Sequence, residues 1–272
     1  MIIQRKAIDY AGRFSPELLS ALRSHGISVV IRYVGQVDNP KCITRSELAA
    51  LHGAGLDVCF VYETTADWMR GSVDAGRIAA GRITSYMQAI GGPARPTVYL
   101  AADFDVSSSD LQHLASCCRG AALSMGADHV GIYGGYFAVH GLLSMGAARY
   151  GWQTYAWSHG LWDERAGIRQ VAGTPYGKLP VGYDADEVLA ADVGQWPAVK
   201  PVPMHTVLLD VPADIYMHAA LWSAAWPHRA AWKVADRLPA QYGKRRIAMP
   251  MDAYQHQELW VKSWRSRRRW EV

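Results

Sequence analysis

Apolar blocks alternate with amphipathic segments from residue 6 to residue 188. The β-branched run at 28–35 predicts a buried strand, and the pattern at 15–26 predicts a helix with Ser15 as N-cap and Pro16 in its first turn. The same alternation predicts strands at 6–12, 28–35, 57–63, 96–106, 129–135, 150–158, 167–173 and 181–188, and helices at 15–26, 44–55, 72–90, 107–126 and 137–146. Eight strands, most followed by a helix or long loop, predict an α/β fold, a (β/α)8 barrel of TIM type. A doubly wound sheet is the alternative.

Carboxylates recur where the predicted strands end. They lie at the ends of the first, third and fourth strands, as Asp9, Glu63, Asp103 and Asp105, and in the eighth strand, as Asp184 and Asp186. A closed barrel would bring these strand ends to one mouth, where barrel enzymes carry their catalytic groups. Each acid alone could equally cap the following helix or turn. The recurrence on four strands favours a common site.

Aromatic residues accompany these acids at or near the same strand ends. They are Tyr10, Tyr33, Tyr62, Tyr133, Tyr155 and Trp157. Carboxylates can act on the hydroxyls and the glycosidic oxygen of a sugar, and aromatic rings stack on its apolar face. The set therefore favours a polyhydroxylated substrate.

The chain changes character after Trp196. Residues 201–272 hold 11 Lys or Arg and 6 Asp or Glu, a net charge of +5, whereas residues 1–200 hold 17 and 18, a net charge of −1. Six of the eleven tryptophans also lie after residue 200. We expect a barrel over 1–196, a proline-rich linker over 197–204 and a short basic, Trp-rich extension over 205–272. Such an extension could bind an anionic polymer or membrane surface, dock on a partner protein, or pack on the barrel.

Other function classes lack their sequence signals. The chain has no GxGxxG, Walker or HExxH motif, no zinc-finger spacing and no nucleic-acid module, so we expect no cofactor, no metal and no nucleic-acid partner. The four cysteines are expected to be reduced and partly buried. No apolar run is long enough for a transmembrane segment. The start, MIIQRKAIDYAG, is no signal peptide, so we expect synthesis in a cytoplasm.

Seven blocks resemble a known family. In order, AIDYAGR, VVIRYVG, TRSELAALHGAGLDVCFVYE, VYLAADFDV, GADHVGIYGGY, RYGWQTYAWSHGLWDERAGIRQ and YDADEVLAADVGQW resemble the actinobacterial and actinobacteriophage glycoside-hydrolase-like domain family, formerly a domain of unknown function. The resemblance covers residues 5–196. That family is similar in fold to the Chalaropsis-type lysozymes, which cleave peptidoglycan between muramic acid and glucosamine.

The resemblance implies roles for the acids. Asp9 matches the first-strand Asp, and Asp103 matches the Asp of an Asp-x-Glu pair. Asp105 stands in place of the general acid Glu; it is one methylene shorter and holds its proton less well unless buried. Glu63 is the alternative general acid. The expected catalytic residues are Asp9, Glu63, Asp103, Asp105 and Asp184, and the expected substrate-binding residues are Arg32, Tyr33, Tyr62, Tyr133, Tyr155, Trp157 and Asp186.

Two function classes follow. The first is a peptidoglycan glycosidase of the muramidase or lysin type, encoded by an actinobacteriophage and reaching the cell wall after holin release. The second is a non-catalytic virion protein of a tail or tail tip, whose barrel binds cell-wall glycan or serves structurally and whose residues 205–272 contact other virion proteins. A weaker alternative is a bacterial cytoplasmic protein acting on another sugar polymer.

Overall fold

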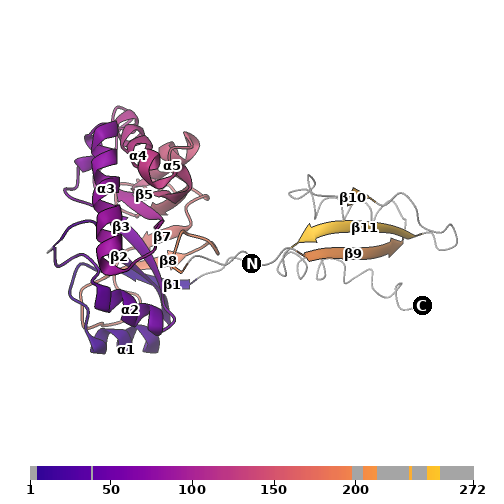
Figure 1. Cartoon of the computed structure of the whole chain (residues 1–272), viewed down its shortest axis with the longest axis horizontal. Helices are drawn as coiled ribbons and strands as arrows, with labels where there is room; N and C mark the ends of the chain where they lie inside the picture. The colour runs from indigo at the N-terminus through magenta and orange to yellow at the C-terminus, as the bar shows by residue number, and fades with distance from the viewer. Residues whose placement is uncertain (1–4, 38, 198–204, 213–232, 235–243, 252–272) are drawn as a thin grey trace. The chain divides into compact units, whose positions relative to one another are not determined.

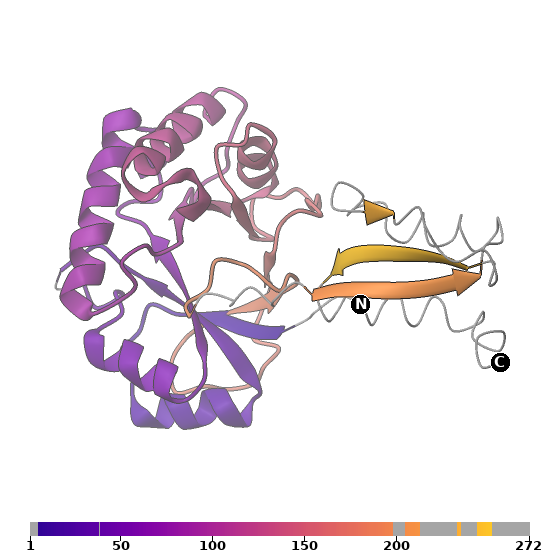
Figure 2. The ribbon, with the colours of Figure 1, turned by 45° about the vertical axis from the view of Figure 1, so that its right-hand side comes forward.

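The computed structural model describes residues 5–37, 39–197, 205–212, 233–234 and 244–251 (Figure 1). The chain divides into two compact units, Met1–Val199 and Lys200–Val272. Six tryptophans of the expected extension lie outside the described residues: Trp222, Trp226, Trp232, Trp260, Trp264 and Trp270. The second unit contributes a sheet in the order β10-β11-β9, in which the antiparallel β9 and β11 lie side by side (Figure 2).

The sheet of the first unit closes into a barrel in chain order, β1 to β8, as expected. Its strands are β1 (Arg5–Asp9), β2 (Ile27–Tyr33), β3 (Asp57–Tyr62), β4 (Val98–Ala101), β5 (Val130–Gly134), β6 (Tyr150–Gln153), β7 (Ile168–Val171) and β8 (Asp184–Val188); the second unit holds β9 (His205–Pro212), β10 (Lys233–Val234) and β11 (Lys244–Met251). The α-helices are α1 (Pro16–Ser24), α2 (Arg45–Gly53), α3 (Val73–Ile90), α4 (Leu111–Met125) and α5 (Tyr136–Ser144). In both views these helices lie outside the barrel (Figures 1 and 2).

The last strand differs from a regular (β/α)8 barrel. Strand β8 runs antiparallel to both of its neighbours, β1 and β7, whereas the other pairs are parallel. Within the described chain, the segments from β6 to β7 and from β7 to β8 are loops without an α-helix. A short loop can return the chain as an antiparallel strand, but a parallel strand needs a longer crossover. As a result the first residues of β8, rather than its last, lie beside the end of β1.

Strand alternation divides the core into two layers. Inward side chains such as Val29, Ile31 and Cys59 fill the barrel, and outward ones such as Val30 and Phe60 pack beneath the helices. The four cysteines are free and buried, as predicted. No helix among the described residues is long and apolar enough to span a membrane.

Helices α3 and α4 pack with unusually close backbones. A Cβ on Gly76 would lie 1.9 Å from the carbonyl oxygen of Cys117, and one on Gly120 would lie 1.9 Å from that of Val73. A side chain at either position would force the helices apart, because the obstacle is backbone rather than a flexible side chain.

Candidate active site

Four carboxylates converge on the barrel mouth, the end where β1, β3 and β4 finish and β8 begins. Asp9 ends β1 and is in register with Asp184, the first residue of β8. Glu63 directly follows β3, and Asp103 follows β4 by two residues. All four charges act on one phenol: after burial, they are the causes that raise the pKa of Tyr33 on β2. The strand ends therefore bring these four carboxylates to one end of the barrel.

Glu63 and Asp103 form the half-buried part of this cluster. Burial is the main cause that raises the pKa of each, and the charge of Asp103 raises the pKa of Glu63 further. Lys41, on the loop between β2 and α2, lowers both pKa values and so partly offsets these effects. A carboxyl with a raised pKa keeps its proton to higher pH, and a general acid needs this property.

Asp9 lies deeper and titrates near neutrality. Burial, followed by the charge of Asp184, raises its pKa from 3.8 to about 7. Opposing these causes, Gln170 Nε2 on β7 donates to Asp9 Oδ2 at 2.8 Å, and a hydrogen bond with Asp186 also lowers the pKa. The Tyr133 hydroxyl donates to Gln170 Oε1 at 3.1 Å, so this expected sugar-binding residue reaches the same network. The network ties β1, β5, β7 and β8 together beneath the mouth.

Asp186 lies inside the barrel rather than at its mouth. Because β8 is antiparallel, the chain runs from the mouth into the barrel after Asp184. Asp186, two residues further on, is fully buried. Trp152 Nε1 donates to Asp186 Oδ1 at 2.8 Å, and the rings of Trp152 and Tyr133 lie 4.3 Å apart. Asp186 was expected to bind substrate, but its buried side chain is not accessible to a sugar at the mouth.

Asp105 is separated from the buried acids. Strand β4 ends at Ala101, so it is shorter than the predicted strand 96–106, and strand alternation does not continue to Asp105. The Asp105 side chain is 55% exposed and lies 3.2 Å from His159 Nε2. It is not among the causes that raise the pKa of Asp103. The carboxyl whose charge raises the pKa of Asp103 is Asp184, and the charge of Asp103 in turn raises the pKa of Glu63.

Arg32 and Tyr62 face away from the mouth, which corrects two expected substrate contacts. Each lies one residue from an inward position on its strand, and a one-residue offset reverses the face. Arg32 is buried against α2, where its Nε donates to Glu47 Oε1 at 2.6 Å. Tyr62 is buried against Trp68, with ring centroids 5.1 Å apart. Both residues hold the helical layer on the barrel.

Tyr155 and Trp157 lie on the loop after β6, which is hydrogen-bonded to the end of that strand. Strand β6 ends at Gln153, whose Nε2 donates to Ser158 Oγ at 3.0 Å and to the Leu161 carbonyl at 2.8 Å. Trp157 has a left-handed backbone, with φ of +54°, a strained conformation that the surrounding contacts must maintain. Tyr155 is 59% exposed, so its ring is available to a ligand.

Sequence reasoning missed Lys41, Gln170 and Trp152. Gln170 occupies an inward position of β7, in register with Asp186, but an isolated glutamine carries no motif. Trp152 occupies an inward position of β6, and the two-residue alternation of that strand could have predicted its place inside the barrel. Lys41 lies on a loop, where strand period gives no direction. Among the described residues, no group of three or more His, Cys, Asp or Glu is arranged to hold a metal ion.

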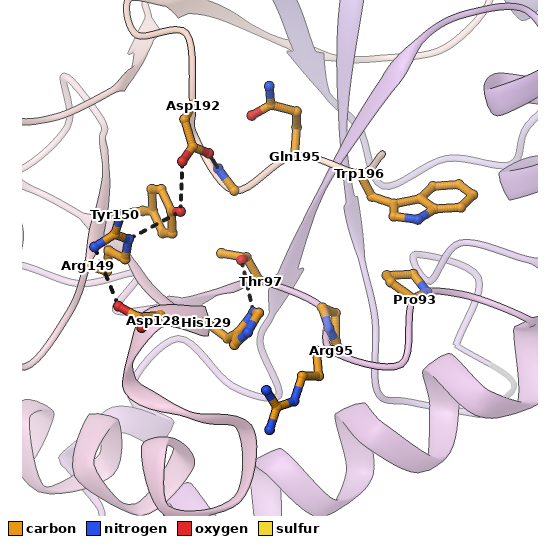
Figure 3. Close-up of a pocket in the computed structure, with 12 residues that line it drawn as sticks. Pro93, Arg95, Thr97, Asp128, His129, Arg149, Tyr150, Asp192, Gln195 and Trp196 are labelled. Carbon is orange, nitrogen blue, oxygen red and sulfur yellow. Dashed lines mark hydrogen bonds and ion pairs between the residues drawn. The ribbon is translucent and has the colours of Figure 1, made fainter. Parts of the chain in front are cut away.

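A cavity lies at the opposite, floor end of the barrel. It has a volume of about 400 Å³, and residues that precede β4, β5 and β6 line it, together with the loop after β8 (Figure 3). Its polar side chains are largely paired with one another: Tyr150 donates to Asp192 at 3.1 Å, and Arg149 lies 3.4 Å from Asp128. None of the expected site residues lines this cavity.

Comparison with solved structures finds similar proteins. Two crystal structures of the Mycobacterium tuberculosis Tat-secreted protein Rv2525c, one with HEPES and one with L-tartrate, are each 27% identical, with a TM-score of 0.63 over 71% of this chain and 98% of that chain. The modular autolysin LytC of Streptococcus pneumoniae, solved with a synthetic peptidoglycan ligand, is 12% identical, with a TM-score of 0.49 over 68% of this chain and 46% of that chain. No curated protein gives a significant sequence match.

The family model described as the Rv2525c-like, glycoside hydrolase-like domain matches residues 20–188, which is more than half of the chain. This span runs from α1 to the end of β8 and includes Glu63, Asp103 and Asp184. The chain therefore belongs to the family of Rv2525c-like, glycoside hydrolase-like domains.

Proposed function

We propose that the protein hydrolyses the glycan chain of peptidoglycan, with Glu63 as general acid and Asp103 as its partner carboxylate. The observation that carries this proposal is the half-buried Glu63–Asp103 pair at the mouth, in which burial and the neighbouring charge raise the pKa of Glu63. Two carboxyls on either side of the scissile bond are the usual requirement for glycoside hydrolysis. The substrate class follows from the family's fold similarity to the lysozymes.

Each mouth residue then has a chemical task. Glu63 would protonate the glycosidic oxygen as the bond to the leaving sugar breaks. Asp103 would stabilise the positive charge that develops on the sugar ring, and Asp9 with Asp184 would support that charge or orient the substrate's acetamido group. Tyr33 and Tyr133 would line the sugar site from within, and the exposed ring of Tyr155 would stack on a neighbouring sugar.

The two candidate general acids can be separated by matched substitutions. Glu63→Gln removes the proton donor and keeps the shape, so hydrolysis of dye-labelled peptidoglycan should fall about 10²- to 10⁴-fold. Asp105→Asn changes an exposed carboxylate and should retain activity within a few fold. The reverse ranking would assign the acid role to Asp105. Retained binding to whole cell walls would show that each variant is folded.

The position of Asp105 favours one alternative, a non-catalytic cell-wall-binding module. The residue that takes the lysozyme general acid's place is an exposed carboxylate beside His159. In this alternative the barrel binds glycan in a phage virion, and residues 205–272 contact other tail proteins. Stoichiometric recovery of the protein with purified virions, without hydrolysis, would support it. For the enzyme, we propose an actinobacteriophage lysin that reaches the cell wall after holin release.

A further inference from the structure

A buried hydrogen-bond network continues below the proposed catalytic acids and includes a carboxyl oxygen without a donor. Asp186 is fully buried, and its Oδ1 accepts the Trp152 indole N–H at 2.8 Å. Its Oδ2 has no N–H or O–H donor among the described residues. An ionised carboxylate left in this state in a barrel interior is strongly unfavourable.

A second carboxyl lies beside it on the inner face of the barrel: Asp186 is in register with Ala7 on β1, two residues before Asp9, and with Gln170 on β7. Asp9 forms a hydrogen bond with Asp186, and its Oδ2 already accepts from Gln170 Nε2 at 2.8 Å. Two ionised carboxylates cannot hydrogen-bond to each other, because neither carries a donor. A single proton on Asp186 resolves both problems, since Oδ2 then becomes a donor to Asp9.

We propose that Asp186 is a positioning residue that keeps its proton at neutral pH and donates it to Asp9, so that the pair carries at most one negative charge. The proposal assigns the role of Asp186 beneath the mouth and rests on the proposed glycosidase function only for its catalytic consequence. That consequence is that Asp9 is held by two donors, Gln170 and Asp186, with its charge directed toward the bound sugar.

The groups around the pair agree with this assignment. Those that act on it from the surrounding elements are Asp184 on β8, Tyr33 and Arg32 on β2, Cys59 on β3, Tyr133 on β5 and Tyr176 on the loop before β8. Burial raises the pKa of the thiol and the three phenols, so these groups are neutral. Arg32 faces outward and is paired with Glu47. Among the described residues no Lys or Arg forms an ion pair with Asp9 or Asp186. Burial is the main cause that raises the pKa of Asp186 well above its usual value, and the charge of Asp9 is the next.

Infrared spectroscopy tests the proton directly. Full-length protein labelled with ¹³C-aspartate would be measured above pH 8, where Asp9 is ionised. We expect one carbonyl band of a buried, protonated aspartic acid in the wild type. The band should disappear in Asp186→Asn and persist in the matched variant Asp184→Asn, which lies two residues away on the same strand. No such band in the wild type, or an unchanged band in Asp186→Asn, would overturn the proposal.

A second comparison tests the positioning role. In Asp186→Asn the amide can still donate to Asp9, whereas Asp186→Leu fills a similar volume without a donor. Losing one hydrogen bond to a charged acceptor should raise the protonation midpoint of Asp9 in Asp186→Leu by about one pH unit, a tenfold change in proton affinity. Equal midpoints in the two variants would contradict the role. The carbonyl band and the protonation midpoint of Asp9 are both read by spectroscopy and need no substrate. An absence of peptidoglycan hydrolysis would therefore contradict the proposed function without affecting the test of Asp186.

Discussion

The charge of Asp9 should destabilise the folded barrel as the pH rises, and Asp9→Asn should remove this effect. Its pKa is raised from 3.8 to about 7, mainly by burial and then by the charge of Asp184. A raised pKa means that the folded state binds the proton more tightly than the unfolded chain. The associated stability is fully present below pH 3.8 and is lost as the pH rises through about 7.

The magnitude follows from the two pKa values. Since one pKa unit corresponds to about 1.4 kcal/mol, the whole effect is about 4 kcal/mol, of which about 3 kcal/mol falls between pH 5 and pH 8.5. Asparagine is nearly isosteric with aspartate, is uncharged, and retains an oxygen that can accept from Gln170. The difference in unfolding free energy, Asp9→Asn minus wild type, should therefore increase by about 3 kcal/mol over this range.

Urea unfolding monitored by helical circular dichroism would measure this difference. The α-helices described, α1 to α5, all belong to the barrel unit, so their signal is lost when that unit unfolds. Asp105→Asn is the matched control, because it removes a carboxylate that is 55% exposed. A stability difference for Asp9→Asn that is independent of pH, or that decreases as pH rises, would refute the reasoning.

Three further predictions concern packing and binding. Gly76→Ala should destabilise the barrel by about 1–3 kcal/mol, since its Cβ would meet the Cys117 backbone. Gly81→Ala, whose Cβ meets nothing within 4 Å, should stabilise the barrel by about 0.5–1 kcal/mol. Thermal unfolding of the two variants should show these opposite signs. Glu47→Gln should cost about 3–5 kcal/mol in urea unfolding, because it leaves the buried Arg32 guanidinium without its carboxylate, and the double variant Arg32→Met, Glu47→Leu should recover part of this loss. Tyr155→Ala should weaken cell-wall binding about two- to tenfold in a pull-down assay without changing the melting temperature, since the ring is largely exposed, and a large loss of stability would show that the ring is structural.

The two-residue alternation of apolar positions predicted the fold, because inward and outward side chains of the barrel strands alternate in the same way. The apolar blocks located all eight barrel strands and the five long helices, and Ser15 caps α1 as predicted, accepting from the Leu18 N–H at 3.2 Å. The direction of β8 was not predictable in this way, since a strand has the same pattern in either direction. Connection length did not decide it either, since β6 and β7 are joined by a similar helix-free loop and are parallel.

The same period explains where the candidate site residues lie in the barrel. Asp9, Tyr33 and Glu63 continue the inward positions of their strands and reach the mouth. Arg32 and Tyr62 have the opposite parity, and applying the period at each strand would have placed them outside. The expected position of Asp105 was wrong for another reason. Strand β4 ends four residues before it, and side chains do not alternate regularly in the loop that follows. Partners such as Gln170 depend on barrel closure, which pairs residues far apart in sequence.

The most direct test of the central claim is the chemistry of the products. Purified full-length protein would be incubated with mycobacterial and Streptomyces peptidoglycan, in parallel with the Glu63→Gln, Asp103→Asn double variant, and the soluble products would be analysed by mass spectrometry for new reducing ends. We predict muropeptides with new reducing ends from the wild type and none from the double variant. No products from the wild type, with wall binding retained, would contradict a glycosidase at this mouth and make the barrel a glycan-binding module.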